Sequence, residues 1–303
     1  MSPSLGPQVV ASTPEGLVVA RRARVPASSA NLGPGFDTLA LAIARYTEVT
    51  VAPADAFSIS AEGYGSHFPA GPEHFAAKIA SSIFGHSRFA MHVTSEIPMT
   101  RGMGSSAALA VAAAAAAGHP DPFTFAAHLE GHADNAAAAM LGGLVTAAMA
   151  DGEGVARRLP LDPKLRFVIV IPDRLLRTSA ARKVLPSQVP LADVVFQLGR
   201  MGLLVAGLAN HQLLVATAAH DRIHQGQRSS LFPEASHLMA TMVRAGALAS
   251  CWSGAGPSLL GMCVEATVER VAAAANEAMR QLNVDGVAER IEADLIGLVV
   301  TDL

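Results

Sequence analysis

Charge is scarce in this sequence, and lysine is almost missing. Charged residues make up 16% of the 303 residues, the formal net charge is −3, and 19 of the 22 basic residues are arginine. Proteins that hold nucleic acid by its phosphates carry a basic stripe or patch, and the sequence contains none. We therefore expect no nucleic-acid partner.

Cysteine is rare as well. The two cysteines, Cys251 and Cys263, are twelve residues apart, which matches neither a zinc motif nor a disulfide framework. The pattern favours buried free thiols in a reducing compartment, and so predicts a cytoplasmic location.

Long apolar runs are also missing. The longest run, from Ala107 to Ala117, has eleven residues and is mostly alanine, whereas a membrane-spanning helix needs about 20. Residues 1–16 are rich in Ser, Pro and Gly and lack the charged and apolar regions of a signal peptide. They predict a flexible tail. We expect no membrane partner.

Apolar residues are plentiful, at 51% of the chain with a mean hydropathy of +0.36, which excludes a disordered protein. The length predicts about two domains. Strand and helix patterns follow one another without strict alternation, which favours an α+β fold over a doubly wound sheet. Asp, Gly, Arg and Pro interrupt the apolar pattern at 151–165, so we predict domains at 17–158 and 159–303, after the tail at 1–16.

The periodicity of apolar residues predicts the individual elements. Pro26 is expected to end the first strand. The strand patterns cover residues 17–25, 48–51, 57–61, 89–97, 144–148, 167–171 and 259–264. Helix patterns cover residues 73–84, 106–117, 122–141, 192–218, 237–244 and 268–282, with glycines interrupting the fourth. If 122–141 is one helix, Glu130 and Asp134 lie on the same face of it.

A Gly/Ser-rich loop from Pro98 to Ala107 leads from a predicted strand into the alanine-rich helix. Its glycines let the backbone approach a ligand, and the helix N-terminus presents free N–H groups and partial positive charge. Such a site binds anions, most often phosphate. Residues 26–37 and 253–258 form two more loops of small residues, and together the three favour a nucleotide site. An ordinary serine-capped turn is the alternative for any one of them.

Two other nucleotide-binding patterns fit this loop less well. A P-loop requires a lysine after its second glycine, and the three lysines of the chain lie elsewhere. Gly102, Gly104 and Ala107 match the Rossmann spacing, but Asp121, at the distance of the ribose-binding acid, lies in a Pro-flanked loop that precedes a helix.

The polar segment from Glu130 to Asn135 stands out in an apolar neighbourhood. A carboxylate beside a phosphate loop is suited to magnesium, which prefers oxygen ligands and the phosphates themselves. A solvated helix end is the plain alternative. His128 and His132 flank Glu130 at a helical spacing, but the order differs from the His-Glu-x-x-His pattern of zinc proteases.

Six short segments carry the most specific information. They are PASSANLGPGFDTLALAI (26–43), IPMTRGMGSSAALA (97–110), LEGHADNAAAAMLGG (129–143), RTSAARKVLP (177–186), DRIHQGQRSSLFP (221–233) and SGAGPSLLGM (253–262). In this order they resemble the GHMP kinase superfamily. The second and the last mark the superfamily as a whole, whereas the first and third resemble its branch that acts on L-homoserine. The likeness runs from about residue 17 to 300.

This resemblance implies a two-layer α+β fold, with an N-terminal nucleotide-binding half and a ferredoxin-like C-terminal half. It implies phosphorylation of the L-homoserine hydroxyl by ATP and Mg²⁺, on the route to threonine. The expected partners are ATP and a small amino-acid substrate, and the expected assembly is a homodimer.

The resemblance also implies roles for individual residues. At the ATP phosphates it places Pro98, Arg101, Gly102, Met103, Gly104, Ser105, Ser106 and Ala107, with Ser106 and Glu130 at the metal. Around the amino acid it places Asn31, Asp37, His132, Asp134, Arg182, Arg228 and Gly254. The two arginines suit a carboxylate, and Asp37 suits the ammonium. Asn135 stands where related kinases carry a catalytic Asp, so it and Arg182 are expected to serve catalysis without a strong general base.

The chain departs from the family pattern in three places. His74 stands where an Asn is usual near the adenine, Ala133 and Ala138 replace prolines, and Gly226-Gln227 replaces Pro-Tyr before the second substrate arginine. Two alternatives therefore remain open at this point. One is a GHMP kinase with a different small-molecule acceptor, and the other is an ATP-binding sensor without turnover.

Overall fold

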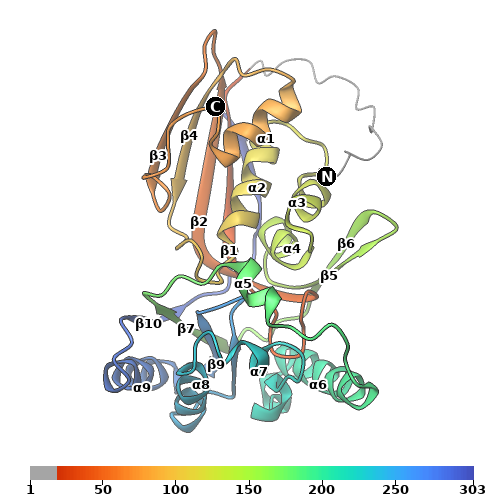
Figure 1. The fold of residues 1–303 in the computed structure, drawn as a ribbon, viewed down its shortest axis with the longest axis vertical. Helices are drawn as coiled ribbons and strands as arrows, with labels where there is room; N and C mark the ends of the chain where they lie inside the picture. The colour runs from red at the N-terminus through yellow and green to blue at the C-terminus, as the bar shows by residue number, and fades with distance from the viewer. Residues whose placement is uncertain (1–18) are drawn as a thin grey trace.

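The computed structural model describes residues 19–303, so the predicted N-terminal tail at 1–16 lies outside the described residues. The chain forms two sheets with helices packed on them (Figure 1). One sheet has seven strands, in the order β11-β1-β2-β4-β3, with β5 paired to β2 and β6 paired to β5. The other has four strands in the order β10-β7-β9-β8.

The larger sheet and its helices come mainly from the first half of the chain. The strands are β1 (Arg21–Ala30), β2 (Leu39–Pro53), β3 (Ser58–Gly63), β4 (Phe89–Ser95), β5 (Leu144–Ala150) and β6 (Glu153–Leu159). The helices are α1 (Phe75–Phe84), α2 (Ser105–Ala116), α3 (Pro122–Glu130) and α4 (Asp134–Leu141). Nearly every residue of α2 is buried, because its alanines let it lie against β1, β2 and the other three helices. The strong hydropathy of this segment thus belongs to the core.

The second half of the chain has a ferredoxin-like strand order. Its sheet comprises β7 (Leu165–Pro172), β8 (Ala249–Trp252), β9 (Leu259–Val264) and β10 (Gly286–Ile291), all paired antiparallel. Helices α8 (Ala235–Arg244) and α9 (Val268–Gln281) pack beside it. The connection from β7 to β8 also carries α5 (Thr178–Lys183), α6 (Leu191–Ala209) and α7 (Gln225–Arg228), with 3₁₀ turns at His211–Leu213 and Ala216–Ala219. This confirms the predicted α+β class and the ferredoxin-like second half.

The last strand returns to the first sheet. β11 (Val299–Asp302) pairs antiparallel with β1, and Asp302 forms an ion pair with Arg21 at 2.9 Å. The division at 158/159 remains a prediction. The chain passes from the first sheet to the second between the end of β6 at Leu159 and the start of β7 at Leu165. Residues 299–302, however, belong to the first sheet.

Two local predictions were wrong. Pro26 does not end the first strand, because a register shift between Pro26 and Ala27 absorbs the proline and the ladder continues to Ala30. The segment 122–141 is two helices, because Gly131 takes a left-handed conformation (φ 75°) and ends α3 after Glu130. Glu130 and Asp134 therefore do not share a helix face.

Helix α6 also differs from its expected form. It runs unbroken through the glycines that were expected to interrupt it and ends at Ala209. Among residues 19–303 it is the one helix long and apolar enough to cross a membrane, with 22% of the tested window buried. One helix of this length and composition is weak evidence for a membrane span. The absence of a membrane partner remains a prediction.

Candidate active site

Hydrogen bonds to backbone carbonyls join three segments that are far apart in the sequence. The Ser28 N–H donates to the Met103 carbonyl at 3.1 Å, and the Gly254 N–H donates to the Ala30 carbonyl at 2.8 Å. The Ser253 hydroxyl donates to the carbonyl of Gly102 at 2.8 Å. The end of β1, the Gly/Ser loop and the 253–258 loop thus form one continuous wall at the junction of the two sheets.

The Gly/Ser loop needs its glycines for geometric reasons. Gly102 and Gly104 have φ values of 72° and 67°, which other residues rarely adopt. A Cβ on Gly104 would lie 2.0 Å from the Ser28 Oγ. Gly104 caps helix α2 without a side chain, so the hydroxyls of Ser105 and Ser106 are not used as caps. The N-terminus of α2 therefore offers free N–H groups and hydroxyls to an anion.

Ser106 and Glu130 lie side by side. The Ser106 Oγ donates to the Glu130 Oε1 at 2.6 Å, and Glu130 is placed there because α3 ends at that residue. Their oxygens are the ligand type that magnesium prefers. Within residues 19–303 no group of three or more His, Cys, Asp or Glu side chains could hold a metal.

The zinc alternative finds no support in the positions of its two histidines. The His128 Nε2 lies 2.8 Å from the carbonyl of Gly152, and the His132 Nδ1 lies 3.0 Å from the Asp134 Oδ1. Each ring is therefore already hydrogen-bonded to a different part of the chain.

Asn135 is held in a network with its neighbours. Its Oδ1 accepts the Ser28 hydroxyl at 2.8 Å, and its backbone N–H donates to the Asp134 Oδ1 at 2.8 Å. Asp134 is 1% exposed, and its second oxygen, Oδ2, is buried with no hydrogen-bond partner among the described residues. The amide of Asn135 thus serves to hold the end of β1, and an amide oxygen is a poor proton acceptor.

Asp37 and Arg182 form a two-pronged ion pair. The Arg182 Nη2 lies 2.6 Å from the Asp37 Oδ1, and the Nη1 lies 2.9 Å from the Oδ2. Burial opposes the charge on Arg182, but the hydrogen bonds and charge of Asp37 outweigh it and raise the pKa of the guanidinium. The backbone N–H of Asp37 donates to the Asn31 side chain at 2.8 Å, which fixes the loop.

Arg228 lies behind this pair and is 1% exposed. Its Nη1 donates to the carbonyl of Gly254 at 3.0 Å and to the His224 Nδ1 at 3.0 Å. Burial and the like charge of Arg182 lower the pKa of Arg228 to about 10, so it stays charged at neutral pH. Arg182, Arg228 and Asp37 form the charged corner of the site, and the carboxylates of Asp134 and Asp221 also favour the charge on Arg228.

His132 stands between the charged groups. Burial and the positive charge of Arg182 oppose protonation of its ring. The hydrogen bond and charge of Asp134, together with the charge of Asp37, outweigh them and raise the pKa of His132. The folded protein therefore favours the imidazolium at pH values where a free histidine is neutral.

This shift predicts a pH-dependent contribution to stability. Because the folded pKa lies above the unfolded one, the His132–Asp134 pair stabilises fully below about pH 6.5 and loses its effect as the pH rises through the folded pKa. We expect the difference in unfolding free energy between the wild type and His132→Gln to shrink from pH 6 to pH 9. Urea titrations across this range measure it, and a difference that grows with pH would contradict the assignment.

Most of the predicted residues line one cavity of about 150 Å³. The predicted residues in its wall are Asn31, Pro98, Gly102, Met103, Gly104, Ser105, Ser106, Ala107, Glu130, His132, Asn135, Arg182, Arg228 and Gly254. Asp37 and Asp134 are not in this lining, but each is hydrogen-bonded to a residue that is, Asp37 to Arg182 and Asp134 to His132, and the Asp37 side chain is partly exposed. Arg101 differs from the expectation, because its guanidinium turns away to Asp173 and the carbonyl of Pro172. Its side chain lines a separate cavity.

Sequence reasoning missed several residues of this wall. They are Met99, Thr100, Leu176, Thr178 and Ala255. Thr178 begins α5 within the RTSAARKVLP segment, so that motif was the signal that could have found it. Leu176 is brought to the site by its backbone N–H, which donates to the Thr100 carbonyl at 2.9 Å.

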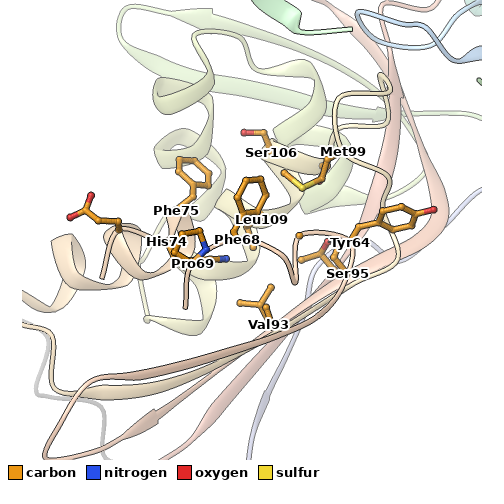
Figure 2. A pocket seen from close by; sticks show the side chains of 15 residues that line it. Tyr64, Phe68, Pro69, His74, Phe75, Val93, Ser95, Met99, Ser106 and Leu109 are labelled. Carbon is orange, nitrogen blue, oxygen red and sulfur yellow. Dashed lines mark hydrogen bonds between the residues drawn. The ribbon is translucent and has the colours of Figure 1, made fainter. Parts of the chain in front are cut away.

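A second cavity, of about 340 Å³, shares Ser105 and Ser106 with the lining of the first. Its wall is mainly apolar, and Figure 2 shows Phe68, Phe75 and Leu109 around the space. His74 also lines it, and burial lowers the pKa of that imidazole. A flat apolar group would fit here at one end of the phosphate-binding loop.

Known proteins share both halves of this architecture. The family model for the N-terminal domain of GHMP kinases matches residues 73–143, and the model for their C-terminal domain matches residues 196–281. Homoserine kinase of Moorella thermoacetica is 38% identical over 79% of this chain and 86% of that protein. Homoserine kinase of Desulfitobacterium hafniense is 33% identical over 92% of this chain and 99% of that protein. The crystal structure of homoserine kinase from Cytophaga hutchinsonii superposes with a TM-score of 0.82 at 26% identity, covering 98% of this chain and all of that one.

The chain therefore belongs to the GHMP kinases, a class of phosphotransferases built from these two domains. Within that class it is a member of the homoserine kinase family.

Proposed function

We propose that this protein transfers the γ-phosphoryl group of ATP to the hydroxyl of L-homoserine, forming O-phospho-L-homoserine for threonine biosynthesis. The observation that carries this proposal is the pairing of two features in one cavity. The N-terminus of α2 offers an anion site, and the Asp37–Arg182 pair with Arg228 offers a site for a zwitterion at the same wall.

The charged corner favours an amino acid over other acceptors. A substrate carboxylate can take the guanidinium of Arg182, with Arg228 behind it, while the substrate ammonium takes Asp37. The exchange keeps all charges paired. An acceptor without an ammonium would leave Asp37 without that partner, which is unfavourable in a partly buried site.

The loop and the two cavities support the placement of ATP. Its phosphates would lie at the backbone N–H groups of the Gly102–Ser106 loop, and its base in the apolar cavity beside His74. The oxygens of Ser106 and Glu130 fit Mg²⁺, and these two residues would hold it. When bound there, Mg²⁺ supplies positive charge that offsets the charge of the phosphates.

Catalysis by this arrangement depends on positioning and charge. Phosphoryl transfer needs alignment of the acceptor oxygen and neutralisation of the phosphate oxygens more than it needs a strong base. Arg182 contributes to both, because its side chain lines the same cavity as the phosphate loop. Asn135 would position groups and would not remove the hydroxyl proton.

Replacing Asn135 by alanine tests this view of the proton. A general base contributes about 10²–10⁴-fold to rate. If Asn135 is not a general base, Asn135→Ala should lower kcat by less than about a hundredfold. The loss that remains reflects the Ser28 contact. Steady-state kinetics with a melting curve measure the effect. Complete inactivity with intact fold and substrate binding would show that Asn135 takes a direct chemical part.

The activity itself is tested by ADP release with Mg-ATP and L-homoserine, with mevalonate, shikimate, pantoate and L-serine as controls. Turnover on homoserine alone supports the proposal. Turnover on another acceptor would assign a specificity role to Gly226-Gln227, which precede Arg228 in α7. Binding of ATP without turnover on any of them would favour the sensor alternative.

We further infer a cytoplasmic homodimer that needs neither a membrane nor nucleic acid. Both cysteines are free and buried, which suits a reducing compartment. Leu191, Val195 and Leu198 on α6 are more than half exposed, and a second copy could cover them. Sedimentation equilibrium measures the mass in solution, and a monomer at micromolar concentration would refute the dimer.

A further inference from the structure

Two like-charged arginines share one aromatic neighbour in the charged corner. The guanidinium carbons of Arg182 and Arg228 lie 5.5 Å and 5.6 Å from the centroid of the Phe36 ring. Burial, and after it the like charge of Arg182, lowers the pKa of Arg228. Contacts that hold Arg228 in place therefore act against this repulsion.

His224 supplies such a contact from beneath. Its ring is fully buried, and its Nδ1 lies 3.0 Å from the Arg228 Nη1. Its Nε2 lies 2.7 Å from the carbonyl oxygen of Gly33. A guanidinium can only donate and a carbonyl can only accept, so both bonds form together only when the ring is neutral with its proton on Nε2. Burial lowers the pKa of His224 and keeps the ring neutral.

The ring of His224 is itself held on several sides. The Asp221 carboxylate accepts the backbone N–H groups of His224 at 2.8 Å and Gln225 at 2.6 Å. The ring centroid lies 5.4 Å from that of Phe36. Gly33 must lack a side chain, because a Cβ there would lie 2.6 Å from the Ala219 carbonyl oxygen just upstream. The loop and the segment that bears His224 are therefore in direct contact.

These contacts connect the two ends of the proposed amino-acid site. Gly33 and Asp37 belong to the same loop, in which the Asn31 side chain accepts the Asp37 N–H. The chain of contacts runs from Arg228 through His224 to Gly33, and then along four residues of backbone to Asp37. The Phe36 ring of the same loop also faces the Arg228 guanidinium, but the other hydrogen bonds of Arg228 go to the carbonyls of Ala181 and Gly254, outside this loop.

We propose that His224 is a positioning residue that locks Arg228 to the loop carrying Asp37, and so fixes the separation between the carboxylate-binding and ammonium-binding groups. This inference rests on the proposed function. It explains why an α-amino acid, whose two charges are separated by one carbon, is the substrate class that the site fits.

Two substitutions at His224 separate the two halves of the link. His224→Asn keeps an acceptor near the position of Nδ1 and loses the bond to Gly33. His224→Gln keeps a donor that can reach Gly33 and loses the acceptor for Arg228. If the whole chain of contacts is needed, we expect each to raise the KM for L-homoserine about tenfold, with kcat and the KM for ATP changed less than about threefold. A normal KM in His224→Asn would overturn the link to the loop.

A double-mutant cycle distinguishes positioning from general structural support. In an Arg228→Met background, His224→Asn should raise the KM no further, because its effect passes through Arg228. Losses that multiply would overturn the proposal. His211→Asn is the matched control, because the backbone N–H of His211 also donates to a carboxylate, that of Asp162, but His211 lies outside the lining of the site. It should leave the KM for homoserine unchanged.

Calorimetric binding of L-homoserine in the presence of a non-hydrolysable ATP analogue repeats the cycle without turnover. If the wild type binds homoserine but does not phosphorylate it, the proposed function fails while the cycle still tests His224. If neither variant folds, ¹⁵N-histidine NMR of the wild type tests the tautomer directly. A proton on Nδ1 of His224 would overturn the proposal, and a proton on Nε2 supports it.

Discussion

Replacing Arg182 by alanine should raise the KM for L-homoserine about a hundredfold and leave the KM for ATP within about a factor of two. Hydrogen bonds to a charged group contribute about 1.5–3 kcal/mol, and a tenfold change in affinity corresponds to about 1.4 kcal/mol. The Arg182 guanidinium now holds Asp37 by two hydrogen bonds. We therefore expect its loss to lower the affinity for L-homoserine about a hundredfold. Initial rates at varied concentrations of each substrate measure the split.

Arg182→Lys is the informative companion. Lysine keeps the charge but cannot form two parallel bonds, so most of the loss should remain. Equal increases in the KM values for L-homoserine and ATP would show that Arg182 supports the whole site and does not bind the amino acid specifically. Full recovery by lysine would show that charge alone matters.

Replacing Gly104 by alanine should abolish ATP binding and lower the thermal stability. The new Cβ would lie 2.0 Å from the Ser28 Oγ and 2.9 Å from the Asn135 Oδ1, at a φ of 67°. The loop must move to relieve this contact, and the free N–H groups of α2 then no longer point toward the phosphate site. We expect kcat/KM for ATP to fall at least about a thousandfold, as measured by initial rates and by calorimetric titration with ATP.

Gly85→Ala is the matched control for backbone strain. Gly85 has a φ of 71°, ends α1, and a Cβ there would meet nothing within 4 Å. It therefore introduces the same unfavourable backbone conformation, at roughly 1 kcal/mol, without a clash. Activity in Gly85→Ala should be normal. If Gly104→Ala bound ATP with the affinity of this control, the loop would not be the phosphate site.

The sequence predicted elements best where one strong local signal dominates. The strand at 259–264 was predicted at its observed bounds, and the alanine-rich helix was shifted by a single residue. The errors at Pro26 and at Gly131 have a common cause. In each case the backbone conformation at one residue, a bulge at Pro26 and a left-handed helix cap at Gly131, decides where an element ends, and apolar periodicity does not report it. Strands β6, β8, β10 and β11 went unpredicted, because β8 and β11 have four residues each and charged residues interrupt the apolar pattern of β6 and β10.

The candidate site was predictable as a set of motifs but not as a set of contacts. The family likeness named Asp37 and Arg182, but no local pattern indicates that residues 145 positions apart form an ion pair. The orientation of Arg101 was equally hidden, because its partner Asp173 lies at the end of β7 in the other half. His224 was passed over within a motif valued for Arg228, since its function depends on the carbonyl of a distant glycine.

The return of β11 to the first sheet restricts how the two halves can move. The chain crosses between the sheets once after β6 and again after β10, where the Asp294 N–H donates to Ala42 at 3.0 Å and the Gly143 N–H donates to the Asp294 carbonyl at 2.6 Å. Two backbone connections restrict the twisting of one sheet against the other more than a single linker would. Rotation about the line through both crossings is the movement that they hinder least. We therefore expect any opening between the two halves to follow that axis.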